Sequence, residues 1–183
     1  MKTGDTDMGF DKLFWGFIFL FDFRIGGLDV LPDFVGYILF YQGLSILEER
    51  NKYFGKAKGF AFPLIFISIL DVYQITEPMN GFDGGAFGLF GVIVGLGLLI
   101  ISMLLVYNIC FGIAEEARGI EDYELERKAL NRWKLYLAIN ILFIVGIILP
   151  FLLAILFIVI LVASITSYLL MLGLMKSASH SLE

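Results

Sequence analysis

The chain has 183 residues, of which 59% are hydrophobic, and its formal net charge is −5. Ordinary soluble domains are about half apolar, so a chain with a mean hydropathy of +0.88 cannot hide its apolar surface from water. No basic stretch is dense enough to follow a phosphate backbone, which argues against nucleic acid as a partner. The composition predicts one all-α domain, over residues 1–176, whose partner is the lipid bilayer.

Six apolar runs predict a bundle of about six transmembrane helices, at residues 10–23, 34–47, 60–75, 86–112, 135–149 and 151–175. The last two runs are continuous, and as a single helix they would be about 62 Å long, roughly twice the hydrocarbon core. We therefore expect the chain to fold back at Pro150. The first two runs give only about 21 Å of helix each, so we expect their connection to dip into the membrane as a re-entrant segment.

Basic residues are concentrated in every second connection. They flank the first run, fill the connections before residue 60 and across 113–134, and follow the last run at Lys176. The alternate connections contain only Arg24. Because short cytoplasmic loops retain Lys and Arg, both termini are predicted to face the cytoplasm, and the protein is predicted to lie in the cytoplasmic membrane.

Residues 113–134 are predicted to form an amphipathic linker helix on the cytoplasmic surface. Gly119 can end the fourth span, and Glu124 and Lys128 have the i,i+4 spacing of an ion pair. Trp133 lies between two basic residues, as in an interfacial anchor. The alternative is a docking surface for a partner protein.

Small residues recur along one strip of the fourth span, at Gly84, Gly88, Gly91 and Gly95. This spacing lets another helix approach closely. The partner helix is either another span of the same chain or a second protein, so a homo-oligomer or a membrane-protein complex through this strip is an open possibility.

Costly polar side chains converge near the predicted outer face. We interpret them as the ligand-binding lining of an acidic vestibule, formed by Asp22, Arg24, Asp29, Asp33, Tyr37 and Asp71. A purely structural interpretation is open for some of them. Asp29 can cap the second helix, Asp33 suits its dipole, and Arg24 can pair with Asp22.

A second polar set lies toward the cytoplasmic half of the later spans, at Asn108, Asn140, Ser164, Thr166 and Ser167. Hydrogen bonds between helices explain such residues. In a transporter they would instead form the inner half of the path.

Catalytic, metal and cofactor motifs are missing from the sequence, so no cofactor, metal site or catalytic residue is predicted. Cys110, the only cysteine, is expected to serve packing. The tail 177–183 is polar and unpatterned and resembles residues added by cloning, which makes His180 a poor functional candidate.

Residues 29–37, with the sequence DVLPDFVGY, precede an apolar helix with a charged end at 48–51. This stretch resembles a motif, D-[IV]-L-P-D-F-[IV]-G-Y, of uncharacterised multi-pass membrane proteins of Gram-positive bacteria. The resemblance implies a bacterial cytoplasmic membrane and no particular activity.

Three functions fit these features. The first is a transporter or lipid-handling protein whose outward-facing acidic vestibule attracts a cationic or amine-bearing ligand. The second is a non-catalytic scaffold or regulatory subunit that binds other membrane proteins. The third is an intramembrane enzyme that depends on carboxylates.

Overall fold

The computed structural model describes residues 3–20, 24–25, 28–29, 33–74 and 86–182, with side chains over 7–20, 33–68, 95–146, 149 and 156–182. In this part of the chain the fold is all-α apart from a minimal pair of strands. The helices are α1 (Thr3–Phe19), α2 (Asp33–Leu47), α3 (Lys52–Gln74), α4 (Ala86–Gly119), α5 (Tyr123–Ile148) and α6 (Pro150–Ser181). The strands β1 (Arg24–Ile25) and β2 (Leu28–Asp29) pair in antiparallel fashion, with Arg24 opposite Asp29.

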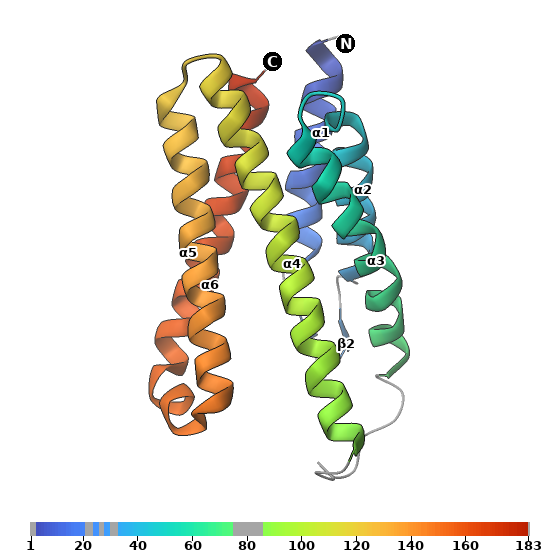
Figure 1. Ribbon diagram of the computed structural model, residues 1–183, viewed down its shortest axis with the longest axis vertical. Helices are drawn as coiled ribbons and strands as arrows, with labels where there is room; N and C mark the ends of the chain where they lie inside the picture. Colours follow the sequence, from blue (N-terminus) through green and yellow to red (C-terminus); the bar gives the residue numbers. More distant parts are fainter. Residues whose placement is uncertain (1–2, 21–23, 26–27, 30–32, 75–85, 183) are drawn as a thin grey trace.

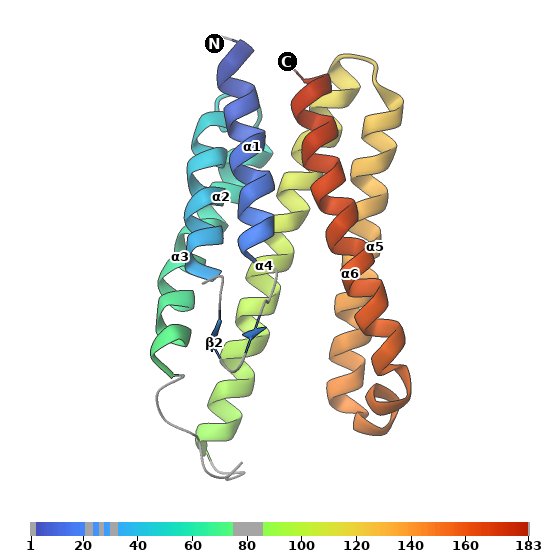
Figure 2. The ribbon, with the colours of Figure 1, turned by 180° about the vertical axis from the view of Figure 1, so that it is seen from behind.

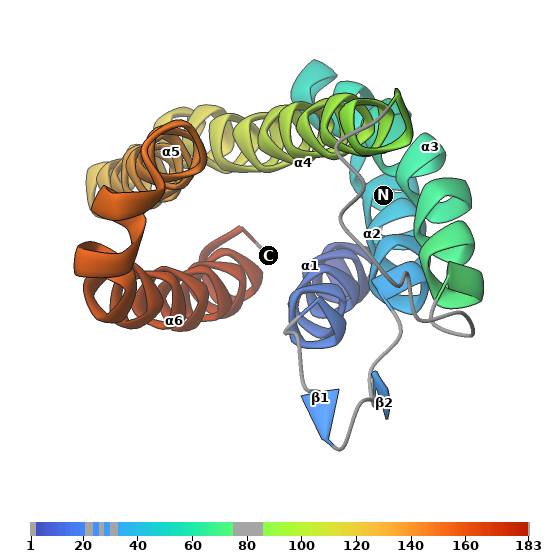
Figure 3. The ribbon, with the colours of Figure 1, turned by 90° about the horizontal axis from the view of Figure 1, so that it is seen from below.

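The helices run alternately up and down and form a ring. Each packs against the next helix in the sequence, and α1 closes the ring by packing against α6 (Figure 3). Both termini therefore lie at one end of the bundle (Figure 1), as an even number of antiparallel helices requires. The buried core gathers at this end, around Phe10, Phe54 and Ile113.

Most helices extend beyond the apolar runs that predicted them. The helix predicted at 10–23 begins at Thr3 and ends at Phe19, and the one predicted at 60–75 begins at Lys52. Lys, Glu and Arg are good helix formers, so charged flanks continue a helix where hydropathy ends. An apolar run thus locates a helix but not its first or last turn.

The predicted separate linker helix over 113–134 is wrong. The structure continues α4 to Gly119, turns, and begins α5 at Tyr123, so the segment is the tip of a helical hairpin. Buried Leu125 and Ala129 face the bundle and hold the tip against it. A free amphipathic helix would have left this apolar face to the lipid surface.

Local contacts stabilise the hairpin tip. Glu121 has a φ of 60°, the left-handed conformation that reverses the chain. The Asp122 carboxylate then caps α5 by accepting a 2.9 Å hydrogen bond from the Leu125 backbone N–H. The predicted pair of Glu124 and Lys128 is confirmed, with 2.8 Å between its charged atoms, and it lowers the pKa of Glu124.

The predicted turn at Pro150 is confirmed. Helix α5 ends at Ile148, Leu149 stands between the helices, and Pro150 is the first residue of α6. Proline lacks a backbone N–H, which the first turn of a helix does not need.

The tail 177–183 is not unpatterned in the structure. Helix α6 continues to Ser181, and both Ala178 and Leu182 are buried. Their spacing of four residues places them on the face that already carries Leu174, so the helix has a reason to continue. His180 is exposed.

Helices α1 and α2 are shorter than the rest and end part of the way along the bundle (Figure 2). The strand pair that follows α1 lies level with the lower parts of α4, α5 and α6 (Figures 1 and 2). The chain therefore turns from α1 to α2 within the length of the bundle, as the predicted re-entrant connection would. Its depth in a membrane stays a prediction.

The close approach of two helices occurs between α1 and α2, and sequence reasoning did not expect it there. A Cβ on Gly43 would lie 2.7 Å from the Gly9 backbone oxygen, and one on Gly36 would lie 2.9 Å from the Gly16 oxygen. Gly9 and Gly16 of α1 are seven residues apart, as are Gly36 and Gly43 of α2, so each helix repeats the contact after about two turns. At Gly95, in the predicted strip, a Cβ would meet nothing within 4 Å.

The rest of the predicted strip is only partly described. Gly88 and Gly91 lie in α4, while Gly84 lies outside the described residues.

Within the described residues, two helical segments are long and apolar enough to cross a membrane. They are Gly95–Gly119 and Leu156–Ser181, with mean hydropathies of 2.3 and 2.4. Only 39% and 17% of these segments' apolar windows are buried inside the protein. The two segments point to membrane association, and the six-span bundle stays a prediction.

Candidate functional site

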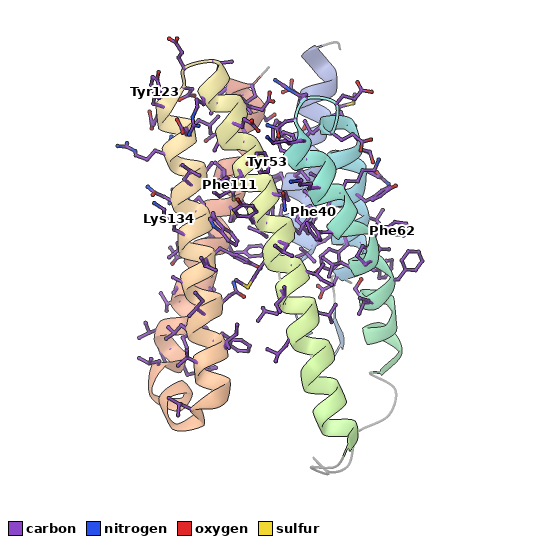
Figure 4. The ribbon with its side chains drawn as sticks, in the orientation of Figure 1. Phe40, Tyr53, Phe62, Phe111, Tyr123 and Lys134 are labelled. Atoms are coloured by element: carbon purple, nitrogen blue, oxygen red, sulfur yellow. The ribbon has the colours of Figure 1, made fainter. Side chains whose placement is uncertain are left out.

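A central cavity of about 340 Å³ lies inside the ring, below the packed core. Its described lining comes from α1, α2, α4, α5 and α6. Phe40, which lines it, lies on the inner side of α2, whereas Phe62 points outward from α3 (Figure 4). A cavity shared by five helices depends on the ring being closed.

The cavity is lined by many polar groups for a space among apolar helices. Its polar lining residues are Asp33, Tyr37, Ser102, Tyr136, Asn140, Ser164, Ser167 and Tyr168. Asp33 is the only charged residue in the described lining.

Asp33 and Tyr37 stand one turn apart at the start of α2, so both face the cavity. Asp33 is exposed and marks the mouth, while Tyr37 is half-buried further in. The positive end of the helix dipole stabilises a carboxylate at this position.

Aromatic rings from three helices form a wall behind the mouth. The Phe17 ring of α1 lies 4.8 Å from the ring of Phe40 and 6.2 Å from that of Tyr168, both in edge-on geometry. Tyr37 lies 6.4 Å from Phe40. Ring faces attract organic cations, so this wall complements the carboxylate.

Ser167 is a buried hydroxyl at the inner wall. It is 4% exposed, and its Oγ has no hydrogen-bond partner within the described part of the chain. Asn140, by contrast, donates from Nδ2 to the Tyr136 backbone oxygen at 2.8 Å. A buried polar atom without a partner is unusual, because leaving it unpaired costs free energy.

The structure brings two residues of the predicted outer set, Asp33 and Tyr37, to the cavity. Arg24 and Asp29 are opposite each other in the strand pair. Asp71 lies in the last turn of α3, which contributes no described lining residue. The side chains of these three residues, and all of Asp22, lie outside the described residues, so their part in a vestibule stays a prediction.

Three residues of the predicted inner set, Asn140, Ser164 and Ser167, line the same cavity as Asp33. The two sets were expected to be separate. They meet because α1 and α2 are short, so that α2 begins level with the middle of its longer neighbours (Figure 2).

The other two inner residues do not line the cavity. Asn108 donates to the Leu104 backbone oxygen at 2.7 Å, and exposed Thr166 donates to that of Val162 at 2.8 Å. Both side chains are satisfied by their own helix.

Sequence reasoning missed Ser102, Tyr136 and Tyr168. A signal for the tyrosines was present in the spacing of the chain. Tyr136 and Asn140, like Ser164 and Tyr168, are polar pairs at i,i+4 inside apolar runs, and such pairs share one helix face. Asp33 and Tyr37 form a third pair of this kind.

Ionic contacts join helices at the end of the bundle that carries the termini. Arg50, in the turn after α2, contacts Glu116 of α4 at 3.0 Å and donates to the Leu182 backbone oxygen at 2.9 Å. Lys58 contacts Glu48 at 2.8 Å, which raises the pKa of Lys58. Ion pairs as well as apolar packing therefore stabilise this end of the bundle.

A second hollow, of about 370 Å³, lies between α1 and α6 near the termini. Its lining includes Asp7, Asp11, Lys176 and His180. Across the described residues, no three His, Cys, Asp or Glu side chains are grouped to hold a metal ion.

The fold and the cavity together define a ring of helices around a polar and aromatic binding pocket, an arrangement suited to a small molecule. No family model matches the chain, and comparisons with curated proteins and with solved structures find no similar protein. The function has to be inferred from the cavity itself.

Proposed function

We propose that the chain is a multi-pass protein of the cytoplasmic membrane that binds a small cationic or amine-bearing ligand in the central cavity, as a transporter. The proposal includes six spans and cytoplasmic termini. The observation that carries it is that the Asp33 carboxylate lines the central cavity together with the aromatic side chains of Phe17, Tyr37 and Tyr168.

Exposed apolar side chains support the membrane setting. Phe157, Ile158 and Leu169 of α6 are 59%, 72% and 61% exposed. Each such side chain forfeits up to about 1.5–3 kcal/mol when it stays in water rather than in an apolar medium. Lipid would cover this surface, and the alternating basic connections favour cytoplasmic termini.

The chemistry of the cavity supports a cationic ligand. An ammonium group at the mouth would form a charge-assisted hydrogen bond with Asp33 and lie against the rings of Tyr37 and Tyr168. The predicted contributions of Asp22, Asp29 and Asp71 would strengthen the negative field along the approach. Asp33 would repel an anionic ligand.

The proposal is tested by binding to the full chain in lipid nanodiscs. Phenethylamine, tetramethylammonium and benzoate serve as cationic and anionic probes, measured by titration calorimetry. We expect both cations and not benzoate to bind, and Asp33→Asn to weaken cation binding by about tenfold or more, because a charge-assisted contact is lost.

Asp11→Asn is the matched control, because it removes the same charge from the hollow between α1 and α6. Unchanged cation binding in folded Asp33→Asn protein, or no cation binding by the wild type, would contradict the proposal.

The topology is tested with single cysteines at Glu49 and Glu121 in a Cys110→Ala background. Both positions are exposed and lie at the end of the bundle that carries the termini. An impermeant maleimide should label both from the cytoplasmic side only. Labelling from opposite sides would overturn the six-span arrangement.

A second candidate function, a scaffold or regulatory subunit, is favoured by one observation. Gly95 of α4 is exposed, and nothing in the described chain fills the space above it. If a partner helix packs there, Gly95→Leu should abolish crosslinking to that partner, while Gly59→Leu, equally open on α3, should not. Crosslinking that survives Gly95→Leu excludes this surface.

The carboxylate-dependent enzyme has less support. An acid and base pair made of two carboxylates needs a second carboxylate beside Asp33, and the described lining holds no other.

A further inference from the structure

The lining of the cavity includes an exposed carboxylate and a buried hydroxyl, and these two groups narrow the class of ligand that the proposed function leaves open. Asp33 is exposed at the mouth, and Ser167 is buried at the inner wall. The Ser167 Oγ has no partner among the described residues. A serine hydroxyl rotates between staggered positions about χ1, so it can turn toward a ligand group that enters.

The group that reaches Ser167 has to be uncharged. No Lys or Arg belongs to the described lining, so a carboxylate or phosphate at the inner end would be buried without a counter-charge. The nearby groups of Asn140 and Ser164 are neutral as well. A hydroxyl fits, because it can donate to or accept from a serine.

The part of the ligand between the two ends has to be apolar and flat. Phe17, Phe40 and Tyr168 line the same cavity as Asp33 and Ser167, and aromatic groups pack favourably against aromatic rings. The cavity volume of about 340 Å³ is within the range of small-molecule pockets. This space suits a ligand with one ring and a short chain.

We propose that the cavity selects an arylalkylamine that carries a hydroxyl group on its ring, with the ammonium at Asp33 and the hydroxyl at Ser167. This inference rests on the proposed function and adds the class of ligand to it. Amino acids are excluded as ligands, because their carboxylate would lie beside Asp33.

The test compares three probes that differ by one group. Tyramine has both the amine and the ring hydroxyl, phenethylamine lacks the hydroxyl, and tyrosine adds a carboxylate. With the full chain in lipid nanodiscs, we expect tyramine to bind about three- to tenfold more tightly than phenethylamine. This is the ratio of affinities that the net free energy of one neutral hydrogen bond gives. Tyrosine should not bind.

Variants of Ser167 test whether its hydroxyl causes the preference for tyramine over phenethylamine. Ser167→Ala should bring the ratio of the two affinities to about one, and Ser167→Thr, which retains a hydroxyl, should keep the preference for tyramine. Thr166→Ala is the matched control, because the neighbouring Thr166 hydroxyl is exposed and bonded to its own helix. Circular dichroism and melting temperature check that each variant is folded.

The outcomes separate this inference from the function on which it rests. Equal affinities of the wild type for both amines, or a preference that persists in folded Ser167→Ala protein, overturn the inference. If those amines still depend on Asp33, the proposed function stands. Absence of any Asp33-dependent amine binding overturns both.

Discussion

The contact between α1 and α2 makes a quantitative prediction about Gly43. An alanine Cβ at this position would lie 2.7 Å from the Gly9 backbone oxygen. Carbon–oxygen contacts between helices normally begin at about 3.3 Å, so the two helices would have to separate by roughly 0.6 Å. Overpacking of this kind costs about 1–3 kcal/mol, and a backbone atom cannot move aside as a side chain can.

Gly59→Ala provides the control for the same substitution. A Cβ at Gly59 would meet nothing within 4 Å, and the residue lies inside α3, where Ala is favoured over Gly by about 0.5–1 kcal/mol. This gain is common to both variants, so the difference between them isolates the clash. We expect Gly43→Ala to melt below Gly59→Ala by about 2–12 °C, the shift that 1–3 kcal/mol gives in a chain of this size.

The assay is thermal unfolding in one detergent at one protein concentration, followed by helical circular dichroism. Equal melting temperatures for the two variants would show that the helices are not in backbone contact at Gly43. The packing of α1 on α2 would then have to differ from the structure.

Three further outcomes follow from charged and buried groups. Arg50→Met should lower stability by about 1–3 kcal/mol, because it leaves the half-buried Glu116 carboxylate unpaired, and a smaller loss in Glu116→Gln would confirm this cause by melting temperature. The Lys128 contact lowers the pKa of Glu124, so this pair stabilises the fold fully above the ordinary pKa of a carboxyl group, and the stabilisation is lost as pH falls through the lowered pKa. Lys128→Gln should raise the pKa of Glu124, as measured by NMR titration. Cys110 is fully buried and should resist maleimide until the protein is denatured, so rapid labelling of the folded chain would contradict its position.

Hydropathy predicted where the helices lie because burial of apolar side chains leaves a long-range pattern in the sequence. The same pattern and a single proline predicted the fold-back at Pro150. Helix ends were less predictable, since charged flanks such as the one beginning at Lys52 are helical without being apolar. Leu125 and Ala129 were assigned to a surface helix because their burial depends on a tertiary contact that no local pattern records.

The candidate site was only partly predictable for a related reason. Sequence reasoning can identify Asp33, Asn140 and Ser167 as costly polar residues, but their distance from one another depends on how far along the bundle α2 begins. The glycines gave a similar error. Gly91 and Gly95 have the familiar four-residue spacing, whereas the contact at Gly43 and Gly9 joins two helices that show no such spacing at these positions.

The seam between α1 and α6 joins the two ends of the chain, whereas the other principal helix contacts join sequence neighbours. Local hairpins form readily, and the entropy of loop closure makes the longest-range contact the slowest to form. A nascent chain released after α5 would carry Asp33 and Tyr136 on an open arc, with the wall that Ser167 completes still missing. Binding of the proposed ligand should therefore begin only after α6 has been made, and chains truncated before α6 should neither bind nor compete for the ligand.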